Sequence, residues 1–317
     1  MAGDLPHRSR AVRLSTTSHA GAPAGDDGAV LDRFSPEALF VISGISQYTG
    51  AVIAIGMFDE VAPATVAWVR VIGAAAILAL IGWRHHRRRW TRRDLGAAAT
   101  FGVATALMNM CFYLAIDRVA LGKSVVIEFI GPIAVAAAFT RTRRNTVALS
   151  LATVGVVVLS GVEIDGEPLG LFYIFCASAM WAAYIVIGRR VAALDRGTAG
   201  IGVGLAIGAL AITPFGVPDA GSLFARPSLI AAGLAAGLFS NAIGYGIDQN
   251  VMRRIPVRRF ALLLALLPVT AMVVGFVALD QRPAGFDLAG AALVIAGVAI
   301  QERDSLESES QVVATPQ

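Results

Sequence analysis

Charged residues are scarce in this chain. Asp, Glu, Lys and Arg make up only 15% of its 317 residues, whereas 56% are hydrophobic. A soluble domain usually carries about 25% charged residues. Apolar stretches recur between residues 38 and 300, and each is long enough to cross a hydrocarbon core about 30 Å thick. The composition therefore predicts an all-α membrane protein that crosses the bilayer many times.

Residues that hold metals or carry out catalysis are also few. The two cysteines, Cys111 and Cys176, lie within apolar runs, which favours packing over a disulfide or a metal site. The four histidines lie outside the apolar runs, and the chain has no Ser-His-Asp order, no HExxH and no CxxC. We expect no metal, no cofactor and no enzymatic activity.

Two glycine-containing strings resemble nucleotide-binding motifs but lack their spacing. Gly122-Lys123-Ser124 would end a phosphate-binding loop, yet position 117 is Asp where that loop requires glycine. Gly202, Gly204 and Gly208 have the wrong spacing for a dinucleotide site. Small residues at 204 and 208 predict close packing between helices instead.

The positive charge is concentrated in short connections between apolar runs. Ten spans are predicted near residues 38–57, 63–82, 95–116, 122–139, 145–161, 169–187, 198–217, 228–247, 257–278 and 285–300. With the N-terminus inside, the cytoplasmic segments carry 21 Arg or Lys residues and the outer ones carry 4. This asymmetry places both termini in the cytoplasm. Such clusters indicate orientation in a lipid bilayer, and we expect no binding of nucleic acid.

The ends of the chain differ from its apolar middle. Residues 1–36 are polar and rich in Gly, Ser, Ala and Arg, and residues 302–317 are acidic. Both compositions predict disordered tails. Between them we assign residues 37–161 to a first repeat of five helices and residues 162–301 to a second.

A shift of 136 residues relates the two halves. It places Thr105 on Asn241, Asn109 on Tyr245, Arg118 on Arg254, Lys123 on Arg259 and Pro132 on Pro268. Because five spans is an odd number, the second copy must enter the membrane upside down relative to the first. Inverted repeats of this kind are typical of secondary transporters, whose substrate sites lie near the midplane.

The stretch from Asn109 to Pro132 contains the strongest single signal. Glu128 lies well inside an apolar run, where an ionised carboxylate costs at least about 2.5 kcal/mol unless it has a partner, a proton or water. Pro132 lacks the N–H that would bond the carbonyl of Glu128. Pro132, and Pro268 in the second half, therefore predict helix breaks that line a hydrated pathway.

Arg70 is predicted to lie at the same depth as Glu128. Counting from Pro63 and from Gly122, both are about 10 Å from the outer side at 1.5 Å per residue. Equal depth predicts an ion pair between them. In a functional role, Arg70 could bind a carboxylate substrate, or it could release Glu128 to take a proton. Alternatively, the pair could simply hold two helices together, and the sequence leaves both roles open.

Other polar residues form stripes at helical spacing. Candidate cavity residues on these stripes are Gln47, Asn109, Tyr113, Trp181, Tyr184, Asn241 and Tyr245. One stripe alone usually joins helices, whereas four stripes on corresponding spans favour a polar central cavity. Asp248 continues one stripe but stands near the predicted cytoplasmic end, where solvent could equally account for it.

At these positions the sequence resembles a known family. CFYLAIDRVALGKSVVIEFIGPIAV, residues 111–135, is similar to the fourth-span signature of EamA-type carriers in the drug/metabolite transporter superfamily, and in particular to the threonine/homoserine exporter branch. The resemblance implies ten helices in two inverted repeats and export of amino acids or related small metabolites across a bacterial inner membrane. Proton antiport follows by analogy. The residues that match are Arg70, Tyr113, Glu128, Pro132, Trp181 and Tyr184.

Two alternatives stay open beside an amino-acid exporter. The same architecture could export a drug or another metabolite. A membrane receptor or scaffold that transports nothing is the alternative from another class, but it would need no acid inside the membrane.

Overall fold

A computed structural model describes residues 31, 33–82, 90–119, 124, 127–159, 167–194, 198–279 and 284–314. Within these residues all regular secondary structure is helical. The elements are α2 (Pro36–Ile55), α3 (Pro63–Ile81), α5 (Arg92–Ile116), α7 (Ile130–Ala138), α8 (Arg143–Leu159), α9 (Pro168–Ala192), α10 (Thr198–Gly216), α11 (Gly221–Ala225), α12 (Pro227–Ala236), the π-helix η1 (Gly237–Gly244), α13 (Tyr245–Arg254), α14 (Val257–Leu263), α15 (Leu266–Leu279) and α16 (Gly285–Ala314).

Helices occupy each of the ten ranges in which the sequence predicts a span. Six of the described helices are long and apolar enough to cross a membrane, namely α2, α3, α5, α9, α10 and the continuous run α12–η1–α13. The other ranges hold shorter or interrupted helices: α7, α8, α14 with α15, and the apolar part of α16. The all-α membrane architecture is therefore confirmed, whereas the count of ten spans and the cytoplasmic termini stay predictions.

The helices begin where local sequence chemistry favours a start. Proline stands at the first position of α2, α3, α9 and α12, where its missing N–H removes no helical bond. Ser35 accepts a hydrogen bond from the backbone N–H of Ala38 at the start of α2. Thr91 and Asp94 form a capping box at the start of α5. These signals determine where the helices named here begin.

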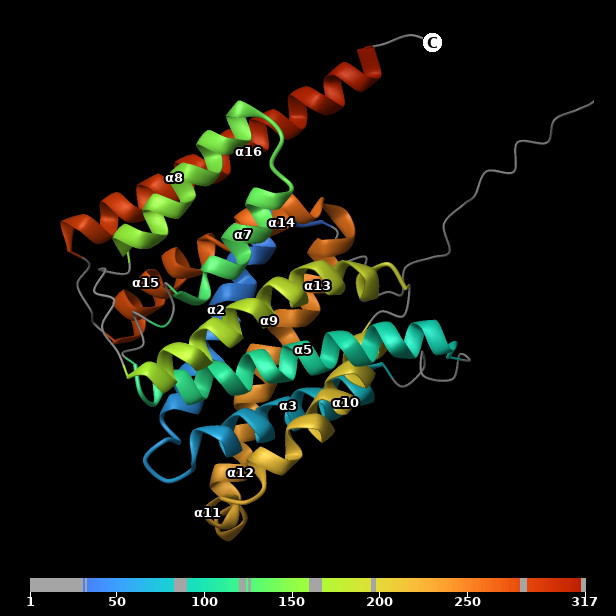
Figure 1. Cartoon of the computed structure of the whole chain (residues 1–317), viewed down its shortest axis with the longest axis vertical. Coiled ribbons are helices and arrows are strands. Elements are labelled where there is room, and N and C mark those ends of the chain that lie inside the picture. The colour runs from blue at the N-terminus through green and yellow to red at the C-terminus, as the bar shows by residue number, and fades with distance from the viewer. Residues whose placement is uncertain are drawn as a thin grey trace, which may run out of the picture.

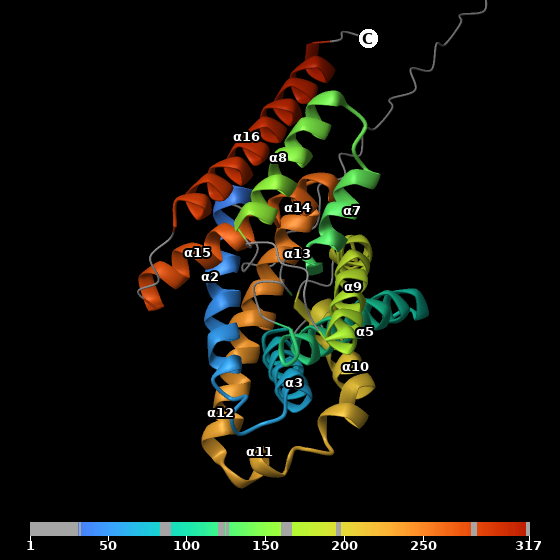
Figure 2. The same ribbon diagram turned by 60° about the vertical axis from the view of Figure 1, so that its left-hand side comes forward.

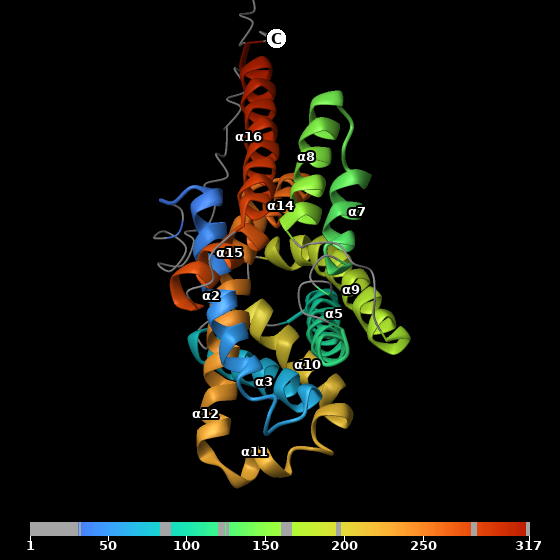
Figure 3. The same cartoon turned by 90° about the vertical axis from the view of Figure 1, so that its left-hand side faces the viewer.

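The helices divide the molecule into two ends with connecting helices between them. Helices α7, α8, α14, α15 and α16 lie at one end, and α3, α5, α10, α11 and α12 lie at the other (Figures 2 and 3). Helices α2, α9 and α13 run between these ends (Figure 1). The final pair, α8 and α16, lies side by side at the upper edge of Figure 1.

Each of several contacts between helices has a counterpart in which every helix is replaced by the corresponding helix of the other half. Helix α2 packs on η1 as α9 packs on α5, and α2 packs on α15 as α9 packs on α7. Helices α8 and α16 pack on each other, as do α7 and α14. A pseudo-two-fold relation between two five-helix halves has this pattern. The division of the chain into two repeats stays a prediction that this pairing supports.

Close approach of α5 and α10 depends on glycine. A Cβ added to Gly102 would lie 1.7 Å from the carbonyl oxygen of Gly204, and one added to Gly208 would lie 2.2 Å from the carbonyl oxygen of Gly102. No side chain fits at such distances. The close packing predicted for Gly204 and Gly208 is confirmed, and it brings α5 against α10 directly behind the residues described next.

The predicted tails lie mostly beyond the described residues. The first tail, residues 1–36, is described only at residue 31 and from residue 33 onward. At the other end, the backbone of α16 continues to Ala314, past residue 302, where the sequence places the start of the second tail.

Candidate functional site

A cavity of about 140 Å³ opens between the two ends of the molecule. Its wall includes eight of the residues that the sequence singles out, namely Gln47, Arg70, Asn109, Tyr113, Glu128, Trp181, Tyr184 and Tyr245. They come from α2, α3, α5, the segment before α7, α9 and α13. Asn241 lies outside the wall but contacts Arg70 from η1. The tertiary structure thus brings the separate polar stripes to one place.

Arg70 is buried, with 4% of its surface exposed. Its guanidinium donates one hydrogen bond to the hydroxyl of Tyr113 and another, of 3.1 Å, to the side-chain oxygen of Asn241. The Nε–H of Arg70 and the side-chain N–H₂ of Asn241 are buried with no acceptor. Buried donors without acceptors are costly in a native protein, so these two indicate a place for an anionic or carbonyl oxygen.

Glu128 lines the same cavity but forms no hydrogen bond or ion pair with any residue that the structure describes. The predicted ion pair with Arg70 is therefore wrong for this conformation. The guanidinium instead points its terminal N–H groups at Tyr113 and Asn241, and equal depth along two separate helices could not reveal this direction. The cavity consequently holds a guanidinium and a carboxylate that do not neutralise each other by direct contact.

The backbone is interrupted at equivalent places in the two halves. A turn at Phe129 separates Glu128 from α7, and a turn at Leu264 and Ala265 separates α14 from α15. The 136-residue shift maps Phe129 onto Ala265, and each interruption lies three residues before its proline, Pro132 or Pro268. Glu128 and Leu264 both line the cavity, so a residue at or next to each interruption faces it. The hinge role of the prolines stays a prediction.

One hydrogen bond joins residues that the repeat makes equivalent. The side-chain N–H₂ of Asn109 donates to the hydroxyl of Tyr245 over 3.0 Å, and these residues are 136 positions apart. Equivalent residues can touch only near the axis that relates the halves. Under the predicted repeat, the cavity therefore lies next to the axis that relates the halves, which is where inverted-repeat transporters bind their substrates.

Aromatic rings form the wall beside the polar groups. Trp181 meets Phe129 edge to face at 4.9 Å between ring centroids, and Tyr184 lies 5.3 Å from Tyr245. Phe101 supports Tyr184 from behind at 5.2 Å. Such ring pairs contribute about 0.5–1.5 kcal/mol each beyond the area that they bury. They give the cavity a defined shape and an apolar side.

Asp248 also lines the cavity, although the sequence leaves its role open. It is buried, with 2% of its surface exposed, and it accepts hydrogen bonds from Ser43 (2.9 Å) and Tyr184 (3.1 Å). The sequence places the end of this span near residue 247, whereas α13 continues to Arg254. The three-residue spacing from Tyr245 was the signal that could have included it.

Other lining residues carried no sequence signal. Apolar or weakly polar side chains complete the wall, among them Ala51, Met108, Phe112, Leu264 and Leu267. Within the described parts of the chain, no group of three or more His, Cys, Asp or Glu side chains could hold a metal ion. The cavity offers one guanidinium, two carboxylates, amides and hydroxyls, which suit the binding of a small molecule with charges of both signs.

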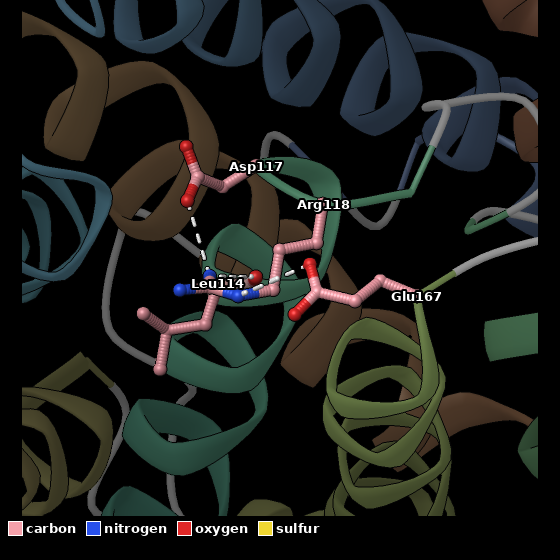
Figure 4. A network of polar contacts seen from close by, with 4 residues as sticks. All are labelled: Leu114, Asp117, Arg118 and Glu167. Carbon is pink, nitrogen blue, oxygen red and sulfur yellow. Dashed lines mark hydrogen bonds and ion pairs between the residues drawn. The ribbon is translucent and has the colours of Figure 1, made fainter.

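Arginines tie helix ends together at two equivalent places. Arg118, after α5, donates to Asp117 (3.1 Å) and to the carbonyl of Leu114 (3.0 Å), and lies 3.9 Å from the carboxylate of Glu167, which precedes α9 (Figure 4). The equivalent residue, Arg254, closes α13. It donates to the backbone carbonyls of Leu31 (3.3 Å) and Phe34 (2.9 Å), which precede α2.

Comparison with known proteins agrees with this arrangement. The EamA-like transporter family matches residues 168–301. The threonine/homoserine exporter RhtA of Salmonella typhimurium is 30% identical over 82% of this chain and 89% of its own length, and RhtA of Escherichia coli K12 is 31% identical over the same shares.

A solved crystal structure with 19% sequence identity superimposes with a TM-score of 0.66 and covers 84% of this chain and 96% of that chain. At that identity the likeness shows a shared fold alone. The identity to the exporters, the coverage of 89% of their length and the apolar helices together define the family. The chain belongs to the EamA-like transporter family, near its threonine/homoserine exporter branch, and is a multi-pass membrane transporter of a small molecule.

Proposed function

We propose that this protein exports threonine- or homoserine-like amino acids across the bacterial cytoplasmic membrane in exchange for protons. The observation that carries the proposal is the cavity in which the guanidinium of Arg70 and the carboxylate of Glu128 face the same space without pairing. The relatives named as threonine/homoserine exporters support the substrate class.

A zwitterionic amino acid satisfies the unpaired groups of both signs. Its carboxylate accepts from the free Nε–H of Arg70, and the side-chain N–H₂ of Asn241 is a second free donor beside that arginine. Its ammonium donates to Glu128. Hydrogen bonds to charged groups contribute about 1.5–3 kcal/mol each, so a ligand that lacks either charge loses at least tenfold in affinity.

The polar side chains around the charges suit a hydroxyl on the substrate. Gln47 and Asn109 reach the cavity from α2 and α5, and each side chain carries both a donor and an acceptor. A threonine or homoserine hydroxyl can bond to such amides. The aromatic wall of Trp181 and Phe129 covers the carbon atoms of the substrate.

Transport then follows from alternating access around this fixed site. The interrupted helices at Phe129 and at Leu264–Ala265 lie in equivalent places on the two sides of the cavity. One half rocks against the other and opens the cavity to each face of the membrane in turn. Proton antiport would supply the driving force.

Purified protein in liposomes tests the substrate class. We expect counterflow of labelled threonine and homoserine, stronger accumulation with an imposed pH gradient, and at least tenfold less uptake of N-acetyl-threonine and of threonine methyl ester. These two analogues remove the ammonium and the carboxylate charge, respectively. Equal transport of both analogues, or no transport of any amino acid, would refute the proposal.

Efflux of a drug or another metabolite is the second candidate function. The observation that favours it is the apolar share of the wall, formed by Met108, Phe112, Phe129, Leu264 and Leu267. The same liposome panel should include a lipophilic cation. Transport of that cation with no competition by threonine would favour this candidate. A receptor or scaffold without transport does not fit the transporter relatives.

A further inference from the structure

The cavity contains a second carboxylate whose surroundings differ from those of Glu128. Asp248 is almost fully buried, and both of its oxygens accept hydrogen bonds, from Ser43 on α2 and from Tyr184 on α9. Glu128 is half-buried and has no such partner among the described residues. A carboxylate held by two helices is suited to a fixed role, and a free one is suited to meeting a ligand.

We infer that Asp248 is the residue that carries the proton through the transport cycle, at a site separate from the Glu128 group that meets the substrate ammonium. The inference rests on the proposed function and deepens it. It assigns substrate and proton to two different acids of one cavity, both within reach of the aromatic wall that contains Tyr184 and Tyr245.

The first argument is the absence of a compensating cation. Among the described residues, no arginine, lysine or histidine lies within ion-pairing distance of Asp248. A charged carboxylate at such depth is expensive unless it is paired or protonated. Two hydroxyl donors are enough to hold the charge for part of a cycle, but they do not neutralise it.

The second argument is that Ser43 can serve both protonation states. Its hydroxyl oxygen lies 2.9 Å from the carboxylate of Asp248 and 3.2 Å from the backbone carbonyl of Gly244. When Asp248 is ionised, Ser43 donates to it. When a proton binds Oδ1 of Asp248, that new O–H donates to Ser43, and Ser43 turns its own proton to Gly244.

This rearrangement leaves every hydrogen-bond donor around Asp248 with an acceptor in both protonation states. A carbonyl oxygen has two lone pairs and can accept from Ser43 beside a helical N–H. Gln47 donates to the oxygen of Ser43 over 2.9 Å in either case. The proton is taken up from one side of the membrane, held as the neutral acid, and released to the other side, so that charge and protons balance.

The third argument is that the backbone at Gly244 brings η1 close to α2, so that Ser43 reaches both Asp248 and Gly244. Gly244 ends the π-helix η1, and helices of this type are frequent at functional sites. A Cβ on Gly244 would lie 2.5 Å from Cγ of Gln47. Glycine therefore lets η1 approach α2 closely enough for one serine to reach two acceptors.

The other charged and titratable groups near Asp248 lie in the cavity wall or on the helices packed against α13. Tyr184 of α9 donates to Asp248, and Tyr245 lies one turn earlier on α13. Tyr48, Arg70 and Glu128 line the same cavity. Helix α10 and η1 carry no titratable side chain. On α14, Arg259 pairs with Glu37 of α2, and the Nε–H of Arg258 is buried with no acceptor among the described residues. On α9, Arg189 donates to the backbone carbonyl of Ile255.

The decisive variant is Asp248→Asn, which copies the neutral acid. In liposomes we expect pH-gradient-driven threonine accumulation to fall at least tenfold more than threonine counterflow measured without a gradient. Accumulation driven by a pH gradient, and proton movement reported by a lumenal pH dye, should fall at least tenfold. Glu128→Gln, by contrast, should lose both counterflow and gradient-driven accumulation. Asp219→Asn, at an exposed aspartate, is the matched control and should change neither assay.

An infrared measurement on the purified protein gives a readout independent of transport. A pH jump should produce the band of a protonated carboxyl group that is missing in Asp248→Asn, and Ser43→Ala should shift the pH at which this band develops. Ser43→Ala also serves if Asp248→Asn does not fold.

The outcomes separate this inference from the proposed function. Retained gradient-driven accumulation in Asp248→Asn overturns the inference, as does an unchanged infrared band or a loss of counterflow equal to that of Glu128→Gln. Absence of amino-acid counterflow in the wild type overturns the proposed function, and the assignment of the proton to Asp248 as a coupling site falls with it.

Discussion

At the scale of single residues, the cavity is defined by polar groups that the protein itself does not satisfy. Arg70 is held by Tyr113 and Asn241 and still keeps one free donor, while Glu128 keeps a free carboxylate. A protein whose only requirement was stability would pair these groups or replace them with apolar ones. Their separation is best explained by a ligand that completes both sets of bonds.

The variant Glu128→Gln tests the acidic half of this arrangement. The amide has the shape of the acid but no charge to attract an ammonium, so we expect threonine efflux driven by a pH gradient to fall at least tenfold. Because Glu128 forms no described hydrogen bond, insertion and melting temperature should change little. Efflux assays and thermal unfolding in detergent measure both. Glu60→Gln, at an exposed residue, is the control, and normal efflux by Glu128→Gln would exclude the proposed role.

The variant Arg70→Lys tests the basic half. Lysine keeps the charge but cannot present several N–H groups in one plane. It should lose a bond to Tyr113 or Asn241 that contributes about 1.5–3 kcal/mol. We expect a lower melting temperature and at least tenfold weaker threonine binding, measured by unfolding and by calorimetry.

The same exchange at an exposed site is the control for Arg70→Lys. Arg226 forms an exposed ion pair with Glu60, and such pairs contribute about 0–1 kcal/mol. Arg226→Lys should therefore leave both measurements unchanged. Equal behaviour of the two variants would show that the fork geometry of Arg70 is unimportant.

At the scale of elements, close helix contacts and interrupted helices position the site. Gly102, Gly204 and Gly208 let α5 and α10 touch backbone to backbone, which fixes the helix that carries Asn109 and Tyr113. Elsewhere in the cavity wall, turns at Phe129 and at Leu264–Ala265 interrupt the helical runs. A close backbone contact together with interrupted helices suits a structure in which some helices move while others stay fixed.

Two glycines on α5 give a matched test of the close contact. A methyl group on Gly102 would clash with the backbone of Gly204, whereas no atom lies within 4 Å of the Cβ position on Gly96. Overpacking costs about 1–3 kcal/mol or more, and an unhindered Gly→Ala change in a helix gains about 0.5–1 kcal/mol. We expect Gly102→Ala to lower the melting temperature and Gly96→Ala to raise it slightly. The reverse order would contradict the α5–α10 contact.

At the scale of the whole molecule, equivalent ties join the halves at two places. Arg118 connects the end of α5 to the start of α9, and Arg254 connects the end of α13 to the segment before α2. By the predicted topology these two ties lie on opposite faces of the membrane. The proposed alternating access requires each to loosen in turn, so their balance should bias which face is open.

Removing one tie should shift that balance in a defined direction. The ion pair of Arg118 with Glu167 is partly exposed, at 28% and 54%, and such pairs contribute at most about 1 kcal/mol, which is about a fivefold change in population. We expect Arg118→Gln to increase labelling of a cavity cysteine, Ala51→Cys, from the outer face, and Arg254→Gln to increase it from the cytoplasmic face.

An impermeant maleimide applied to oriented vesicles measures this labelling. The background protein has Cys111 and Cys176 replaced by alanine. Arg190→Gln, at an exposed residue of α9, is the control. Identical changes at both faces for either variant would show that the ties do not act separately.

Much of the molecule follows from the sequence by itself. Hydrophobic run length determines the helical spans, because a bilayer admits long apolar helices and penalises unpaired backbone groups. The prolines and caps determine where spans begin. Helical spacing and the cost of charge in lipid single out Arg70, Glu128 and the polar stripes, and eight of the residues chosen in this way line one cavity.

The tertiary structure alone decided which of these groups touch. Arg70 bonds to Tyr113 and Asn241 instead of Glu128, and Asp248 lies buried between Ser43 and Tyr184. Periodicity gives the face and depth of a residue on its own helix. The distance between two helices depends on crossing angles, glycine contacts and helix breaks that involve residues far apart in the chain, and hydrogen bonds are decided within about 3 Å.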